Sequence, residues 1–81
     1  MDELPIIDAR GHRCPIPSLR LRKALEGMAA GERVTLLADD PMARIDVPHL
    51  LGQLGSVLLE TREEGRALAF TVEKRARATT G

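Results

Sequence analysis

The order in which two apolar periodicities follow each other is the strongest constraint on what this chain can fold into. Two segments carry one apolar stripe at helical spacing, and short runs typical of strands stand between and beside them. A helix with a single stripe buries it against a neighbouring layer, and in a chain of 81 residues one sheet is the economical layer. The pattern predicts helices packed on one face of a sheet.

Periodicity and the positions of Gly and Pro predict four strands and two helices. The strands are expected at residues 4–8, 34–38, 57–62 and 68–73, with Glu64 and Gly65 between the last two, and the first helix at 15–28. The order βαβαββ, with right-handed crossovers, predicts the α/β (α+β) class. The expected architecture is a two-layer sandwich, with a four-stranded mixed sheet and both helices on one face.

Pro48 complicates the second helix. A proline inside a helix removes one hydrogen bond and costs about 3 kcal/mol. We therefore expect Asp46 to be the N-cap, residues 41–45 to form a separate turn, and Gly55 to end the helix.

Length and composition predict one domain over residues 1–81, with an ordered core at about 4–74 and a flexible tail at 75–81. The core must be aliphatic, because Phe70 is the only aromatic residue. The 12 basic and 12 acidic residues balance, which argues against direct binding to nucleic acid, and no apolar run approaches a membrane span. The acidic start and a single cysteine favour a cytoplasmic protein.

Cys14 is the only cysteine, and it stands between Arg13 and Pro15, immediately before the first predicted helix. A thiol with a pKa of about 8.5 is mostly protonated at neutral pH, whereas a helix N-terminus favours the nucleophilic thiolate. Pro15 suits the first helical position, and Pro17 is tolerated in the first turn. The two prolines remove two amide donors, so activation of Cys14 should depend on the helix dipole and on nearby cations.

Other residues around Cys14 have predicted supporting functions. Arg10 and Arg13 are the expected cations, and His12 is a candidate base or ion-pair partner. Ile16 and Leu19 fall on the side of the helix turned away from the buried stripe, where they predict a docking patch for a partner protein.

Further positions match a known family in order and spacing. They are Asp8, Gly11, Cys14, Pro15 and Pro17, then Arg22-Lys23, Gly31-Glu32, Asp40-Pro41 and Asp46-Val47-Pro48. With them the chain resembles the TusA (SirA-like) sulfur-carrier family over residues 5–75. Arg44-Ile45 and His12 depart from the pattern of some relatives, which leaves the choice of partner open.

The resemblance implies that Cys14 receives sulfane sulfur as a persulfide and passes it on. The implied donor is a cysteine desulfurase, a rhodanese or a related persulfide protein. The acceptor would be a downstream protein of tRNA thiolation, sulfur oxidation or cofactor biosynthesis. Arg22 and Lys23 would contact acidic surfaces of such partners.

The cysteine count shapes the expected mechanism. With no second thiol in the chain, a persulfide on Cys14 cannot be expelled as an internal disulfide, so transfer must be intermolecular. The chain is then a carrier with sulfurtransferase-like chemistry rather than a stand-alone enzyme, and it needs no cofactor.

Three alternatives stay open. Cys14 could be a small buried hydrophobe without chemistry, or the oxidisable thiol of a redox-sensing or regulatory interaction module. Asp39, Asp40, Asp46 and His49 could bind a metal, although Asp residues at helix starts are usually caps, and no metal is expected.

Overall fold

The computed structural model describes residues 4–13 and 16–75 of the chain. Its elements follow the predicted order, βαβαββ. They are β1 (Ile6–Asp8), α1 (Ile16–Glu26), β2 (Arg33–Ala38), α2 (Ala43–Leu54), β3 (Val57–Glu64) and β4 (Ala67–Glu73). The predicted tail lies, except for Arg75, outside the described residues.

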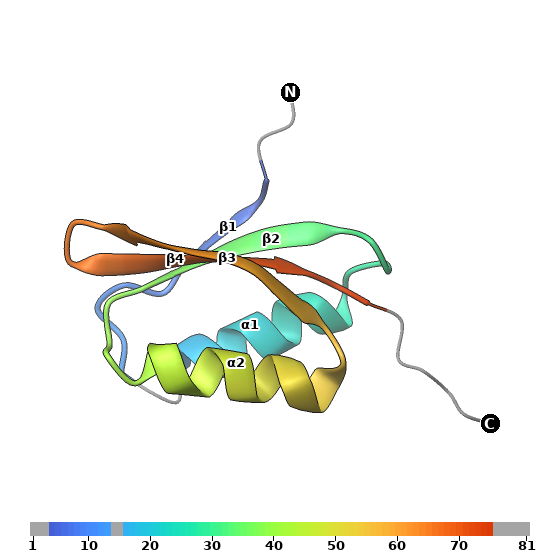
Figure 1. Ribbon diagram of the computed structural model, residues 1–81, viewed down its shortest axis with the longest axis horizontal. Helices are drawn as coiled ribbons and strands as arrows, with labels where there is room; N and C mark the ends of the chain where they lie inside the picture. Colours follow the sequence, from blue (N-terminus) through green and yellow to red (C-terminus); the bar gives the residue numbers. More distant parts are fainter. Residues whose placement is uncertain (1–3, 14–15, 76–81) are drawn as a thin grey trace.

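The four strands form one mixed sheet in the order β1-β2-β4-β3. β1 and β2 are parallel neighbours, and the other two pairs are antiparallel. Both helices lie beneath the sheet on the same side, as Figure 1 shows. The predicted two-layer fold is confirmed. Because β1 and β2 run in the same direction, the segments that follow them leave the sheet at the same end.

The core lies between the sheet and the helices. Leu21 and Leu25 of α1 face it at helical spacing, while Leu36 of β2 and Phe70 of β4 face it from directly paired positions in the sheet. Phe70 is 1% exposed and is the largest of the fully buried side chains. The central strands β2 and β4 therefore form the apolar surface against which both helices pack.

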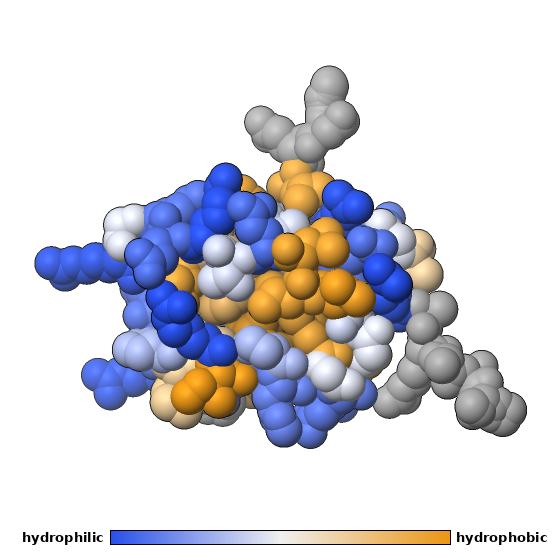
Figure 2. Space-filling model, viewed as in Figure 1, coloured by the Kyte–Doolittle hydropathy of each residue, from blue (hydrophilic) through white to orange (hydrophobic). Residues whose placement is uncertain are grey.

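The core is less tightly closed where α2 meets the edge strand β3. Leu54 of α2 and Leu58 of β3 pack against the core but are only partly buried. Figure 2 shows apolar surface on this side of the molecule, in the region between the helix layer and the sheet. Edge strand β3 thus shields the core incompletely.

The start of α2 differs from the expectation. The helix begins at Ala43 rather than after Asp46, and Pro48 lies inside it. Starting at Ala43 adds a turn that buries Ala43 beside Val47, at 2% and 0% exposure. This apolar burial offsets the single hydrogen bond that Pro48 cannot donate to Arg44. Gly55 ends the helix in the left-handed conformation, at φ 75°, as predicted.

Replacing Pro48 with alanine should stabilise the fold. Alanine restores the amide that the helix lacks at this exposed position, while the unfolded chain gains some conformational freedom. We expect a net gain of about 1–2 kcal/mol in the free energy of unfolding, measured by urea denaturation. A lower denaturation midpoint for Pro48→Ala would show that the helix is not strained by the proline.

The terminal hairpin forms as predicted, with two local differences. Glu64 still pairs with Ala67, so the turn residues are Gly65 and Arg66. A bulge between Leu58 and Glu60 breaks the simple alternation expected for β3 and leaves Leu59 42% exposed. Bulges of this kind are common on edge strands, where they interrupt a regular edge that another chain could pair with.

Candidate functional site

The loop that precedes the first helix leaves the sheet at Ala9. This residue is fully buried, and its amide extends the pairing of β1 with β2 by donating to the carbonyl of Leu37 at 2.8 Å. The four residues that follow, 10–13, are all exposed. Backbone and side-chain hydrogen bonds, rather than buried side chains, must therefore hold this loop in place.

Arg10 pairs with Asp8 across the start of the loop. Its Nε and Nη2 atoms donate to the two carboxylate oxygens at 2.8 Å each, and its backbone amide donates to Asp8 Oδ1 at 3.2 Å. The hydrogen bonds from Arg10 lower the pKa of Asp8 from its usual 3.8 to about 2. The charge of Arg10 is thus compensated by a neighbouring carboxylate, which reduces the positive field it can offer to a thiolate.

A second carboxylate, from Asp39, holds the middle of the loop. The amide of Gly11 donates to both of its carboxylate oxygens, at 3.0 and 3.1 Å. Gly11 has φ 85°, a conformation that favours glycine. Asp39 follows β2 directly, and the parallel pairing of β1 with β2 brings the two loops together. Residues 28 apart in the chain therefore meet beside the predicted site.

Cys14 and Pro15 lie outside the described residues, whereas the residues on either side of them are described. The amide of Ile16 donates to the carbonyl of Arg13 at 2.9 Å, so the loop and the start of α1 are hydrogen-bonded to each other. This bond occupies the Ile16 amide, and Pro17 has no amide hydrogen. Neither residue is then a free backbone donor for a thiolate, and activation by the helix dipole and by cations stays a prediction.

The side chains of α1 are distributed as the helical pattern predicts. Pro17 is buried in the first turn, while Ile16 and Leu19 are 42% and 55% exposed. Arg22 and Lys23 are exposed to solvent, and Arg22 Nε lies 3.7 Å from Glu26 Oε2 in an i, i+4 ion pair. These positions leave Ile16, Leu19 and the two basic side chains accessible, and their binding functions stay predictions.

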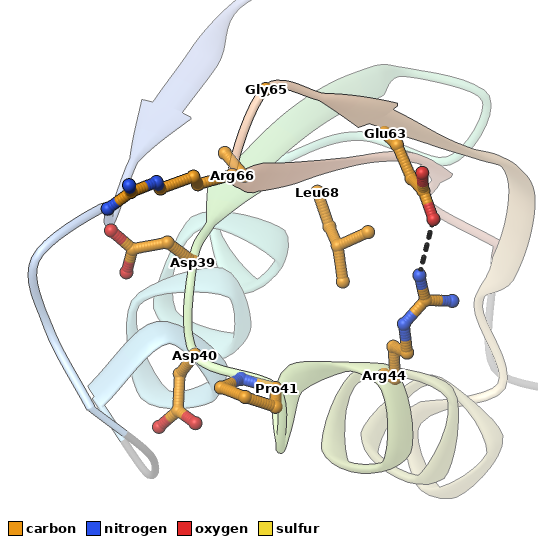
Figure 3. Close-up of a pocket in the computed structure, with 9 residues that line it drawn as sticks. Asp39, Asp40, Pro41, Arg44, Glu63, Gly65, Arg66 and Leu68 are labelled. Carbon is orange, nitrogen blue, oxygen red and sulfur yellow. Dashed lines mark hydrogen bonds and ion pairs between the residues drawn. The ribbon is translucent and has the colours of Figure 1, made fainter.

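Two open cavities flank the segment between β2 and α2. One, of 540 Å³, lies on the side of the loop and is lined by Gly11, His12, Arg13, Asp39, Asp40, Pro41 and Met42. The other, of 280 Å³, lies toward the turn of the hairpin. Figure 3 shows Asp39 and Arg66 at one end of the second cavity and the Arg44–Glu63 ion pair, with an Nη2–Oε2 distance of 2.9 Å, at the other. His12 and Arg13 thus share a surface hollow with Asp39.

The acidic residues considered as metal ligands have structural partners. Asp39 accepts from Gly11, and Asp40 Oδ1 accepts from the amide of Met42 at 3.0 Å, just ahead of α2. Within residues 4–13 and 16–75, no three His, Cys, Asp or Glu side chains are grouped as a metal site would need. In the same part of the chain, neither helix has the length and apolar character needed to cross a membrane.

Comparison with known proteins identifies the family. The model of the family described as sulfurtransferase TusA matches residues 6–74, from β1 to the residue after β4. The chain belongs to the TusA family. The resemblance inferred from the sequence is therefore confirmed, and it covers the sheet, both helices and the loop before α1.

Relatives of this TusA-family chain align over most of their length. A protein of Allochromatium vinosum named sulfur carrier protein TusA is 37% identical over 68 residues, which are 84% of this chain and 90% of that protein. One with the same name in Pseudomonas aeruginosa is 34% identical over 71 residues, covering 88% and 90%. The crystal structure of a SirA-like protein from Desulfitobacterium hafniense matches 90% of this chain and 100% of its own, with a TM-score of 0.77 and 31% identity.

Sequence reasoning missed the contact of Asp39 with the loop. It considered Asp39 only as a metal ligand, because the pattern predicts strands but does not say which strands are neighbours. The sequence did contain one signal. Asp39 directly follows a buried strand, and Gly11 lies in the loop that follows the strand expected to run parallel to it. Met42 and Ile45, 46% and 63% exposed, are two further apolar side chains near the start of α2 that were not predicted to be accessible.

The pair of Asp8 and Arg10 predicts a pH dependence. Because the folded state lowers the pKa of Asp8, the pair stabilises the fold above about pH 4, and this contribution is lost as the pH falls through about 2. An NMR titration of the Asp8 carboxyl carbon should give a midpoint near 2, and Arg10→Gln should return it toward 3.8. A midpoint that does not respond to Arg10→Gln would show that the two side chains are not paired in solution.

Proposed function

We propose that the chain is a sulfur carrier that accepts sulfane sulfur as a persulfide on Cys14 and relays it to an acceptor protein. The observation that carries the proposal is the position of the only cysteine. It stands between an exposed loop and the first turn of α1, in a chain of a family whose curated relatives are named sulfur carrier proteins. A sequence position between an exposed loop and a helix start suits a thiol that must meet two partners in turn.

The chemistry needs only the thiol of Cys14 and its two partners. The thiolate attacks the outer sulfur of a donor persulfide, a new S–S bond forms, and the donor leaves as its thiolate. An acceptor thiolate then attacks the outer sulfur on Cys14, and the Cys14 thiolate leaves. Sulfur is transferred without net oxidation or reduction. The positive end of α1 supports both steps by stabilising the Cys14 thiolate. In the first step it increases the fraction of Cys14 that is nucleophilic thiolate, and in the second it makes this thiolate a better leaving group.

Arg13 is the cation best suited to stabilise this thiolate. It is exposed, and it precedes Cys14 directly, whereas Arg10 is engaged by Asp8. His12 shares the 540 Å³ cavity with Arg13 and can act as a base or ion-pair partner there. These assignments place the activating groups on the loop side of the site.

The donor is a protein that presents a persulfide, such as a cysteine desulfurase or a rhodanese. The acceptor serves tRNA thiolation, sulfur oxidation or cofactor biosynthesis. Ile16 and Leu19 offer exposed apolar area at the start of α1, and Arg22 and Lys23 offer positive charge to acidic partner surfaces. A persulfide relay needs a reduced starting thiol, which suits the cytoplasm.

Mass spectrometry tests the loading step. The chain is incubated with a cysteine desulfurase and free cysteine, and the peptide containing Cys14 should gain about 32 Da, a gain that dithiothreitol removes. Reversal is essential because a sulfinic acid, which carries two oxygen atoms, adds nearly the same mass and resists thiol reductants.

The same peptide separates the carrier from its rival, a redox-sensing module. A sensor would gain no sulfur from the desulfurase and would form oxygen adducts readily under mild peroxide. That combination would overturn the proposed function.

A further inference from the structure

The second carboxylate of the site, Asp39, has no function in the chemistry above, yet it makes a hydrogen bond to a loop residue 28 positions earlier in the chain. Its two oxygens accept the hydrogen bond of the Gly11 amide at 3.0 and 3.1 Å. A charged acceptor gives a stronger hydrogen bond than a neutral one. The contact joins the segment after β1 to the segment after β2.

Asp39 is well placed to act as an anchor because its own backbone is held on both sides. The residue before it, Ala38, is fully buried at the end of β2. The residue after it, Asp40, accepts the amide of Ala43 at 2.9 Å through its carbonyl and the amide of Met42 at 3.0 Å through its side chain, just ahead of α2. The carboxylate of Asp39 therefore projects from a rigid junction between a central strand and a helix.

Within the residues that the structure describes, the other hydrogen bonds of the loop lie at its two ends, from Arg10 to Asp8 and from the Ile16 amide to the Arg13 carbonyl. Residues 10–13 bury no side chain, and the amide of His12 bonds locally to the carbonyl of Ala9 at 3.2 Å. Gly11 lies three residues before Cys14, within about 11 Å along a fully extended chain. The hydrogen bond at Gly11 thus restrains the segment that leads into the thiol.

We infer that Asp39 is a positioning residue for sulfur transfer: by binding the amide of Gly11, it holds the loop that leads to Cys14, and this favours the encounter with a protein donor. This inference rests on the proposed function for its consequence, although the anchoring itself can be measured independently. Asp39 would act through the position of the loop rather than through its charge, since a negative charge near a thiol disfavours the thiolate.

Two substitutions separate the anchor from the charge. Asp39→Asn removes the charge but keeps an oxygen that can accept from Gly11, whereas Asp39→Ala removes both. Glu63→Ala is the matched control, because Glu63 lines the same 280 Å³ cavity as Asp39 but is paired with Arg44 instead of the loop. All variants are first checked by circular dichroism for a native fold.

Three measurements are made on each variant. We expect Asp39→Ala to raise the hydrogen-exchange rate of the Gly11 amide at least about tenfold, because its acceptor is lost. Its rate of sulfur loading from a cysteine desulfurase should fall about tenfold, because a misplaced group is costly in a constrained encounter. Alkylation of Cys14 by iodoacetamide, a small probe that needs no docking, should stay within about twofold. Asp39→Asn and Glu63→Ala should resemble the wild type in all three.

The inference is overturned if Asp39→Ala leaves the exchange of the Gly11 amide unchanged, or frees it while loading proceeds at the wild-type rate. Loss of loading in Asp39→Asn or Glu63→Ala as large as in Asp39→Ala would also overturn it. If the wild type takes up no sulfur, the proposed function fails, and the Gly11 exchange rate alone then decides whether Asp39 holds the loop.

Discussion

Replacing Cys14 with serine should abolish sulfur loading and leave the fold intact. A hydroxyl cannot form the S–S bond on which the relay depends, and the chain has no other cysteine to replace it. We expect no gain of about 32 Da after incubation with a cysteine desulfurase and cysteine, and a free energy of unfolding within about 0.5 kcal/mol of the wild type. Intact-protein mass spectrometry and urea denaturation measure the two effects.

A relocated thiol provides the control for this substitution. Ser18→Cys, made in the Cys14→Ser background, places the only thiol within the first turn of α1, at a half-buried position. If the location ahead of the helix matters, this variant should load at less than about a tenth of the wild-type rate. Loading of Cys14→Ser itself, or efficient loading at position 18, would contradict the assignment of Cys14 as the carrier.

Replacing Phe70 with alanine should have the largest effect on stability. Phe70 is 1% exposed at the centre of β4, opposite Leu36, and it is the only aromatic side chain in an otherwise aliphatic core. Phe→Ala substitutions in cores cost about 3–5 kcal/mol through lost burial and the cavity left behind. A fold of this size has about 4–12 kcal/mol in total, so the variant should keep only a fraction of it.

Leu59→Ala is the matched control on the same hairpin. Leu59 lies in the bulge of β3 and is 42% exposed, so its loss should cost less than about 1 kcal/mol. The chain has no Trp or Tyr, and far-ultraviolet circular dichroism is therefore the appropriate probe of unfolding. A cost for Phe70→Ala as small as that for Leu59→Ala would mean that the core is not centred on β4.

Much of the fold could be predicted because local patterns determine it. The stripe of α1, including Leu21 and Leu25, is confirmed, and so is the burial of Leu68, Phe70 and Val72 in β4. The expected alternation fails at Ala69, which is also buried, at 4% exposure. The start of α2 could not be predicted, since the local cost of Pro48 is offset by tertiary burial of Ala43. The bulge of β3 is likewise a property of an edge strand rather than of its own sequence.

The site was predictable in its sequence-local part only. The burial of Pro17 and the exposure of Ile16 and Leu19 follow from the pattern around one helix start, whereas Cys14 and Pro15 lie outside the described residues. The ion pair of Arg10 and the contact of Asp39 with Gly11 depend on which strands are adjacent, and this emerges only when β1 pairs with β2. A cation expected to activate the thiol is therefore paired with Asp8, and an acidic residue considered only as a metal ligand contacts the loop.

The most direct test of the carrier account is whether sulfur that has reached Cys14 also leaves it for another protein. The wild type is loaded with isotopically labelled sulfur, separated from the desulfurase, and mixed with an acceptor protein that has one reactive thiol. The account predicts that the label moves to the acceptor as a persulfide while the free thiol of Cys14 is restored. Label that stays on Cys14, or that leaves only as sulfide after a reductant is added, would contradict it.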